Sequence, residues 1–557
     1  MPRRRTVAGV LVASLAVCLS VGLLTVGPVQ QQKAAQAERG FSIVSLQPDV
    51  AQALRAQGKP ISYPFPNTAN KGKKFNPGGG TITQLVTAAE QNVLVLFADF
   101  TTPPPGGPVT RLNLGTYFDP MLFGTTYDPP EYASVPGSHP TDRTLFNYYK
   151  EVSYGKVEIG TENMPGTMGW TQSGHPYDYY SKADGIHDNG FGPFPQNVQG
   201  LVLDTVKAAD EDVDFSKYAV NRVIPNLFVV YAGTGAEWSA DPGPIWSHSW
   251  DLTEGTGLTE ADLTFDGVKI NNYAMMPEVG GDLTGYAGVV SGPYPPTVGV
   301  YAHEYGHVLG LPDQYDYGYE SDGTDVYSLM AGGSWNRYPT DRIFSGNSPA
   351  HLDAWSKWLL GFLNPTPITS ATPVTLPPAE TSPVAYKMVV PNSGGKEYFL
   401  LENRQAVGFD QGLARFMTHG LAIYHVDETV FSRNFWRPNE AENWKEFRSE
   451  GWRKAWTGET HYGISIIQAD DQWDLEHARY WITPGVESSL SGDLYPGKLN
   501  VTSFSSYTRP NSSSYYFWGG SEPKYGYSGV TATNIQESAT GVVTANLSFV
   551  PWTSTKR

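Results

Sequence analysis

The feature that most constrains this chain is the stretch from His303 to Asp313, which reads His-Glu-Tyr-Gly-His-Val-Leu-Gly-Leu-Pro-Asp. Histidines four positions apart on an α-helix lie on one face, roughly 6 Å apart along the axis, so both rings can reach one metal ion. Glu304 follows the first histidine, where its carboxylate can take a proton from a metal-activated water and later pass one to a leaving amine. The stretch therefore predicts a metal-binding helix with a general base beside the metal.

The end of that helix predicts the third ligand. Gly310 can adopt a left-handed conformation that turns the chain after His307, and Pro312 resists helical continuation. This geometry directs Asp313 to the metal and leaves the fourth position of a zinc ion for water, as a catalytic site requires. Asp316 is the alternative third ligand.

A chance match explains this motif poorly. With 11 histidines in the chain, the expected number of such matches is on the order of 0.01. A helix is plausible here because Thr297 can cap its start. Its apolar surface would come from Val300, Tyr301, Val308 and Leu309.

A second segment, Ser328 to Trp335, places Met330 in a glycine-rich turn. Metzincins have a methionine in such a turn as a hydrophobic floor beneath the zinc ligands. An isolated methionine is more often ordinary core, but the position just after the zinc segment favours the floor. Gly332 stands where metzincins often have a tyrosine, so the residue that assists at the carbonyl stays open between Tyr327 and Tyr338.

Length and composition predict a globular protein of two or three domains, because the chain has 557 residues of which 40% are hydrophobic. The amino terminus has three arginines, an uncharged apolar run over residues 7–26 and then Ala35-Gln36-Ala37. This pattern predicts a secretory signal over residues 1–37 and an extracellular location, with an uncleaved membrane anchor as the alternative. The single cysteine, Cys18, lies in the apolar run, so the mature protein would have no disulfides.

The net charge limits the classes of molecule that this protein is expected to bind. The formal net charge is −17, and loss of the four cations in the signal would take it to −21. So acidic a protein is a poor partner for nucleic acid or an anionic membrane. We therefore expect protein or peptide substrates, no nucleic acid, no stable membrane association and a monomer.

Residues 38–91 are predicted to be a propeptide or linker, with a short helix near Val50 to Ala56 and an exposed Pro, Gly and Lys-rich stretch over Pro60 to Gly80. The segment has no cysteine or histidine that could mask a zinc ion. Asp49 is one candidate for that role, and assistance in folding is the alternative function of the segment.

Residues 92–363 are predicted to be the catalytic domain. Asn92 to Phe100 and Asn226 to Ala232 have the apolar character of buried strands. Tyr273 to Glu278 is expected to be an edge strand that ends at Pro277, and an edge beside the metal can accept an extended peptide. A helix is expected around His351 to Phe362.

Residues 364–557, after the proline-rich break at Asn364 to Pro367, contain strand-like segments between turns and predict an all-β sandwich. The expected architecture is thus an α/β (α+β) catalytic domain, built around the zinc-binding helix, followed by a β domain.

Taken together, these segments resemble the immune inhibitor A family of secreted bacterial metallopeptidases. The resemblance rests on the zinc segment, the Met330 turn and six other stretches: Tyr148 to Lys156, Ile245 to Trp250, Tyr398 to Arg404, Gly408 to Asp410, Tyr424 to Asp427 and Gly492 to Gly497. It implies a zymogen with signal and propeptide, a metzincin-like catalytic domain with zinc and calcium, and broad endopeptidase activity. It also implies zinc binding by His303, His307 and Asp313, and catalysis by Glu304.

Two acidic groups are candidate calcium sites, because hard oxygen ligands suit that ion. The first comprises Asp316, Glu320, Asp322 and Asp325, and the second comprises Asp470, Asp471, Asp474 and Glu476. Solvated acidic loops are the plainer interpretation, since neither group has EF-hand spacing.

The sequence thus predicts a secreted zinc metalloendopeptidase of the HExxHxxGxxD type. The competing hypothesis is a secreted adhesion protein that binds glycan or protein and has a structural or degenerate zinc site. A structural site would fill the fourth zinc position with a protein ligand, and no such ligand is evident near the motif. Cleavage specificity is not legible from the sequence.

Overall fold

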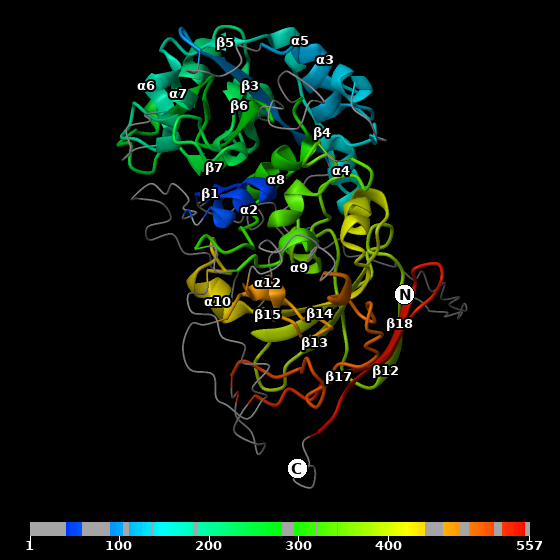
Figure 1. Cartoon of the computed structure of the whole chain (residues 1–557). Coiled ribbons are helices and arrows are strands. Elements are labelled where there is room, and N and C mark those ends of the chain that lie inside the picture. Colours follow the sequence, from blue (N-terminus) through cyan, green and yellow to red (C-terminus); the bar gives the residue numbers. More distant parts are fainter. Residues whose placement is uncertain are drawn as a thin grey trace, which may run out of the picture.

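The computed structural model describes residues 41–57, 59, 90–103, 111–134, 139–181, 188–280, 295–318, 321–341, 343–440, 461–477, 490–516, 518 and 526–551. The predicted signal and the Pro60 to Gly80 stretch lie outside these residues. Figure 1 shows two regions, one with a six-stranded sheet and one with the carboxy-terminal sheets. Among the described residues, no helix is long and apolar enough to cross a membrane.

The first region is organised by a six-stranded sheet with the strand order β1-β7-β10-β6-β3-β5. Strands β3, β5, β6 and β10 are parallel, whereas β7 runs antiparallel to β10 and β1 antiparallel to β7. The sheet is apolar because both faces of its central strands are buried. Its strands are β1 (Ser42–Ile43), β3 (Leu94–Asp99), β5 (Thr171–Gln172), β6 (Leu227–Thr234), β7 (His248–Asp251) and β10 (Asn272–Val279).

All three predicted strands of this region form, but the third, β10, does not lie at the edge of the sheet where we expected it. Strands β3 and β6 coincide with the expected apolar runs. Strand β10 is not the expected edge: it lies between β6 and β7, and Pro277 is paired opposite Tyr231. The missing N–H of Pro277 is tolerated because the register shifts between Pro277 and Val279, as at a β-bulge. The four-residue strand β7, which the pattern did not predict, lies beyond β10 and carries β1 on its other side.

Helices α5, α7 and α8 of this region contact the sheet, and short polar side chains cap the starts of α4 and α7. Thr144 accepts from the Asn147 N–H (3.1 Å) at the start of α4, and Asn197 accepts from the Gly200 N–H (3.0 Å) at the start of α7. The helices are α2 (Pro48–Ala56), α3 (Leu114–Phe118), α4 (Leu145–Val152), α5 (Pro165–Met168), α6 (Tyr177–Ser181), α7 (Val198–Ala209), α8 (Val298–Val308) and α9 (Ala354–Leu359). Two small strand pairs, β2 (Glu90–Asn92) with β4 (Glu158–Gly160) and β8 (Thr264–Phe265) with β9 (Val268–Lys269), complete this region.

The carboxy-terminal region has a five-stranded sheet, β11-β13-β14-β15-β16, and a three-stranded sheet, β12-β18-β17. Apolar side chains of both sheets form one buried cluster, which includes Leu376, Phe399 and Leu547. Two short helices, α10 (Glu428–Arg433) and α12 (Asp474–His477), interrupt the strands and were not predicted. The strands are β11 (Thr366–Pro367), β12 (Thr372–Leu376), β13 (Tyr386–Val389), β14 (Glu397–Arg404), β15 (Gly420–Asp427), β16 (Ile464–Ile466), β17 (Val530–Glu537) and β18 (Val543–Phe549).

Candidate metal centre

Helix α8 carries His303, Glu304 and His307, and all three side chains are buried. The Nδ1 atom of His303 lies 2.9 Å from the Leu329 carbonyl, and that of His307 lies 2.8 Å from the Leu311 carbonyl. A carbonyl only accepts, so both Nδ1 atoms carry the hydrogen and both Nε2 atoms present a lone pair. The two Nε2 atoms lie 3.0 Å apart.

The chain reverses after α8 and delivers Asp313 to the same point. Gly310 has a positive φ of 103°, and the Leu311 N–H donates to the Gly306 carbonyl at the helix end. One carboxylate oxygen, Asp313 Oδ1, lies 3.2 Å from Nε2 of His303 and 3.3 Å from Nε2 of His307. The hydroxyl of Tyr317 donates to the other oxygen and holds the carboxylate in place.

This arrangement fits a divalent metal ion. Two nitrogen lone pairs and a carboxylate converge on one point, with the donor atoms all within 4.8 Å of one another. Nitrogens that share a tetrahedral zinc at about 2.0–2.1 Å lie roughly 3.3 Å apart, close to the separation found here. Without a cation the facing lone pairs would repel. Across the described ranges, His303, His307 and Asp313 form the one such group of metal-ligating side chains.

The surroundings shift the pKa values of Asp313 and Glu304 in opposite directions. Burial tends to raise the pKa of Asp313, but the two imidazoles outweigh it and hold this pKa at about 2. Burial, with Asp313 and Glu237 nearby, raises the pKa of Glu304 well above its ordinary value. Neither oxygen of Glu304 makes a hydrogen bond of good geometry among the described residues, although the Val44 N–H lies beside this carboxyl group and opposes the rise in its pKa. Apart from this N–H, the Glu304 carboxyl group has no hydrogen-bond partner among the described residues and can act on a bound molecule.

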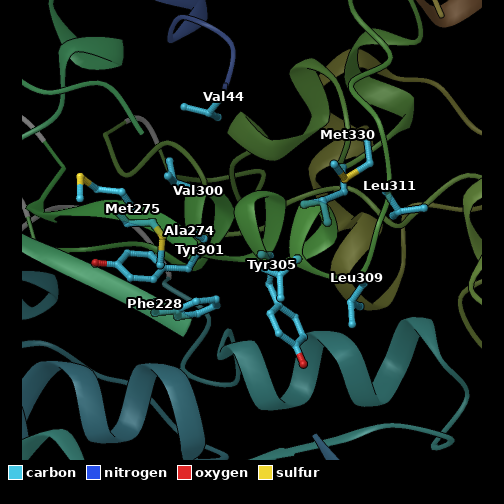
Figure 2. Packing of buried hydrophobic residues seen from close by; sticks show 14 of the residues in the cluster. Val44, Phe228, Ala274, Met275, Val300, Tyr301, Tyr305, Leu309, Leu311 and Met330 are labelled. Atoms are coloured by element: carbon cyan, nitrogen blue, oxygen red, sulfur yellow. The ribbon is translucent and has the colours of Figure 1, made fainter. Parts of the chain in front are cut away.

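The Met330 turn lies directly against α8. A Cβ atom added at Gly306 would lie 2.5 Å from the Met330 sulfur, so the helix and the turn are in close contact at this glycine. The turn also supplies the Leu329 carbonyl that orients His303. Figure 2 shows Met330 and Val44 on the opposite side of the helix from Tyr305.

An amino-terminal segment, residues 41–47, crosses the same side of α8. The indole N–H groups of Trp246 and Trp335 donate to the carbonyls of Val44 (2.9 Å) and Ser45 (3.1 Å). The Gln47 N–H donates to the Glu237 carbonyl at 2.9 Å. All seven residues are buried. This segment lies within the stretch that we predicted to be a propeptide.

Several predicted residues lie elsewhere. Asp316 accepts from the N–H groups of Gly318 (2.9 Å) and Ser321 (3.2 Å) and is not part of the metal-ligating group. Asp49 lies 3.6 Å from Arg337 and is likewise outside that group. The Tyr327 hydroxyl bonds to Asp493 and Thr418 at the junction with the carboxy-terminal region.

Thr297 stands at the predicted cap position of α8, but its side chain makes no capping bond there. Its hydroxyl instead donates to the Ser345 carbonyl at 2.7 Å. Threonine can satisfy more than one local acceptor, and here a long-range contact prevails over the cap.

The two predicted acidic groups meet in space. Asp316, Asp322 and Glu476 all act on the Tyr462 hydroxyl, and with burial they raise its pKa well above the ordinary value. The Asp322 N–H donates to the carbonyl of Leu475, between Asp474 and Glu476. Asp325 is buried with a positive φ of 38°, and Glu320 lies outside the described residues.

Comparison with known proteins identifies the region around this centre. Residues 114–361 match the sequence model described as the immune inhibitor A peptidase M6 catalytic domain. Residues 114–361 belong to the immune inhibitor A family of peptidases. This immune inhibitor A domain begins at α3, ends after α9 and contains the whole metal-ligating group.

Two relatives support the assignment. The immune inhibitor A of Bacillus thuringiensis subsp. alesti is 32% identical over 303 residues, covering 48% of this chain and 39% of that protein. The pre-pro-metalloprotease PrtV of Vibrio cholerae serotype O1 is 32% identical over 295 residues, covering 48% of this chain and 29% of that protein. The matches therefore span well under half of the length of these relatives.

One residue of the site escaped the sequence analysis. The Tyr315 hydroxyl donates to the carbonyl oxygen of Ile43 in the segment that crosses α8. Its position two residues after Asp313 was a usable signal, because the same chain reversal that delivers Asp313 also positions its neighbours.

Proposed function

We propose that this protein is a secreted zinc-dependent endopeptidase that hydrolyses peptide bonds of extracellular proteins. In this proposal His303, His307 and Asp313 bind one catalytic zinc ion and Glu304 is the general base. The observation that carries it is the convergence of two Nε2 lone pairs and one carboxylate oxygen, with both Nδ1 atoms fixed by carbonyls. Membership of a peptidase family agrees with this chemistry.

A bound zinc ion would supply Lewis acidity, which lowers the pKa of water and polarises a carbonyl. The remaining tasks belong to the side chains. The carbonyls of Leu329 and Leu311 hold the imidazoles in the tautomer that exposes Nε2. Glu304 takes a proton from the attacking water and transfers one to the leaving nitrogen.

We further propose the domain organisation given by the sequence: signal 1–37, propeptide 38–91, metzincin-like catalytic domain 92–363 and β-sandwich 364–557. The single antiparallel strand β7 beside a parallel sheet supports the metzincin-like part, as does the contact between Met330 and Gly306. The shared apolar cluster of the two carboxy-terminal sheets supports a sandwich.

We also propose that a calcium ion binds near Asp474 and Asp493 and stabilises the fold. Within the described ranges, neither carboxylate oxygen of the buried Asp474 is hydrogen-bonded, and neither is Asp493 Oδ1. Burial and the charges of Asp474, Asp470 and Glu476 raise the pKa of Asp493 well above its ordinary value. Such crowded carboxylates favour a hard cation between the two acidic groups.

The adhesion hypothesis is the weaker one for this geometry. A structural zinc site is normally completed by a fourth protein ligand. In the part of the chain that the structure describes, the metal-ligating group contains three side chains. This favours an open position and hence catalysis.

The test is Glu304→Gln in the full-length protein, with the exposed Glu158→Gln as the matched control. We expect Glu304→Gln to bind one zinc per chain while its proteolysis of casein falls by a factor of at least about 100. Glu158→Gln should match the wild type in both measurements. Unchanged proteolysis in Glu304→Gln would refute the mechanism.

A further inference from the structure

The segment from Phe41 to Val44 binds at the edge of the sheet as an added strand. Ser42 pairs with Ser249 and Ile43 with His248, antiparallel to β7, and the Val44 N–H continues the pattern by donating to the Ser247 carbonyl at 3.2 Å. Extended peptides bind proteins in this way, with backbone hydrogen bonds for affinity and side-chain pockets for specificity. Figure 1 shows this strand next to α8, which carries the metal-ligating histidines.

The peptide group between Ile43 and Val44 occupies a distinctive position. Its carbonyl oxygen accepts from the Tyr315 hydroxyl. Its N–H, which donates to the Ser247 carbonyl, also lies beside the Glu304 carboxyl group. A peptidase needs these two partners at the bond it cleaves: a donor for the carbonyl oxygen as it gains charge, and an acid beside the nitrogen that leaves.

The side chain of Phe41 lies in an aromatic pocket. Its ring meets Phe191 and Trp250 edge-on, with centroids 5.2 and 5.3 Å away, and lies across the His248 ring at 5.9 Å. His248 is held by the Trp246 carbonyl (2.7 Å) and the Tyr273 hydroxyl (3.1 Å). Burial lowers its pKa to about 4, so the pocket has no charge at neutral pH. Such a pocket suits an aromatic ring.

We propose that residues 41–44 lie in the cleft as a substrate does, with the Ile43 carbonyl where the cleaved bond is placed. Tyr315 is then the catalytic donor to that carbonyl oxygen, and Phe191, His248 and Trp250 form the subsite for an aromatic side chain three residues before the cut. The substrate class is an extended peptide with an aromatic residue there and a branched aliphatic residue at the cut. This inference rests on the proposed endopeptidase function.

The reaction at this position balances with one water molecule. The water oxygen bonds to the carbonyl carbon, the C–N bond breaks, and Glu304 moves a proton to the departing nitrogen. The products are one carboxylate and one amine. Tyr315 donates its hydrogen bond throughout and is not consumed.

The first test is independent of catalysis. In full-length protein carrying Glu304→Gln, hydrogen exchange of the backbone amides of residues 42–47 is compared with and without Phe41→Ala. Ser42→Ala is the matched control, because the buried Ser42 hydroxyl has no hydrogen-bond partner in the part of the chain that the structure describes. We expect exchange to accelerate at least about 100-fold in Phe41→Ala, from the loss of a buried ring, and less than about 3-fold in Ser42→Ala. Equal exchange in the two variants would overturn the aromatic subsite.

The second test uses the full-length chain after identical limited trypsin treatment of every variant. We expect Tyr315→Phe to keep its zinc content and KM while kcat falls at least about 100-fold. Tyr338→Phe, at one of the two tyrosines that the sequence left open for this role, should behave as the wild type. An unchanged kcat in Tyr315→Phe would overturn the catalytic assignment.

A peptide-library digest by the wild type completes the test. Enrichment of aromatic residues three positions before the cut supports the subsite, and their absence among the cleaved peptides refutes it. If the wild type binds zinc but cleaves nothing, the proposed function fails. The exchange measurement still decides whether Phe41 anchors the segment, so the two failures are distinguishable.

Discussion

Arg404 and Asp410 form a two-point ion pair in the interior, with Nε to Oδ2 at 2.8 Å and Nη2 to Oδ1 at 2.9 Å. The same carboxylate accepts from the His351 N–H at 2.8 Å, and Arg404 donates to the Tyr327 carbonyl at 2.6 Å. His351 and Tyr327 belong to the peptidase-family region, whereas Arg404 and Asp410 follow it. The pair therefore connects the two regions of the molecule.

Loss of Arg404 should destabilise the folded protein, because the buried Asp410 would lose its cation. Glu402 and Glu380 would each lose a contact with the same guanidinium group. We expect Arg404→Met to lower the free energy of unfolding by about 3–5 kcal/mol. Arg509→Met, which removes a surface ion pair with Asp471, should change it by less than about 1 kcal/mol. Urea denaturation of both variants measures these changes. Equal losses of unfolding free energy in Arg404→Met and Arg509→Met would show that the buried ion pair stabilises the protein no more than the surface pair does.

The two carboxylates that the sequence left open as third ligand can be separated by mutation. Asp313 lies with the histidines, while Asp316 accepts two backbone hydrogen bonds in its own loop. We expect Asp313→Ala to lose zinc at equilibrium dialysis and Asp316→Ala to retain one ion per chain. Zinc loss in Asp316→Ala alone would reverse the assignment.

A buried carboxyl group that acts on Glu304 through its charge predicts a pH dependence of stability. Glu237 accepts from the hydroxyl (2.7 Å) and N–H (3.1 Å) of Ser247, and burial raises its pKa from 4.5 to about 7. The folded protein therefore holds this proton more tightly than the unfolded chain. The resulting stability is full below about pH 4.5 and is lost as the pH rises to about 7.

Glu237→Gln should remove that contribution. We expect the fall in the free energy of unfolding between pH 5 and pH 8 to be smaller in the variant, by an amount on the order of 3 kcal/mol. Denaturant titrations at the two pH values measure it. Identical falls in both proteins would mean that Glu237 titrates normally.

The carboxylates around Asp474 and Asp493 predict stabilisation by calcium. We expect millimolar Ca²⁺ to raise the Tm of the zinc-loaded wild type by several degrees, through preferential binding to the folded state. Asp474→Asn should be nearly insensitive to Ca²⁺, whereas Asp262→Asn, at an exposed turn, should respond as the wild type. If Ca²⁺ raised the Tm of the wild type, Asp474→Asn and Asp262→Asn equally, Asp474 would not be a calcium ligand.

Much of the fold was predictable wherever residues act through local rules. The apolar runs of β3 and β6, the helix α8 and the turn at Gly310 follow from side-chain pattern and backbone preference. The convergence of His303, His307 and Asp313 follows from helical spacing and one chain reversal. These features need no information from distant parts of the chain.

The rest depends on distant contacts. Strand β7 is short, and its place between β10 and β1 is visible only once the whole sheet is assembled. Thr297 bonds to Ser345, and Tyr315 meets Ile43, which lies far from it in the chain. Pattern analysis of neighbouring residues could not supply these pairings.

The central claim is that two histidines and one aspartate hold a catalytic zinc ion with an open fourth position. X-ray absorption spectroscopy of the zinc-loaded full-length protein tests it most directly. The account predicts two imidazole nitrogens at about 2.0–2.1 Å and oxygen donors from one carboxylate and solvent. A shell of four protein ligands, or a zinc ion without imidazole donors, would contradict it.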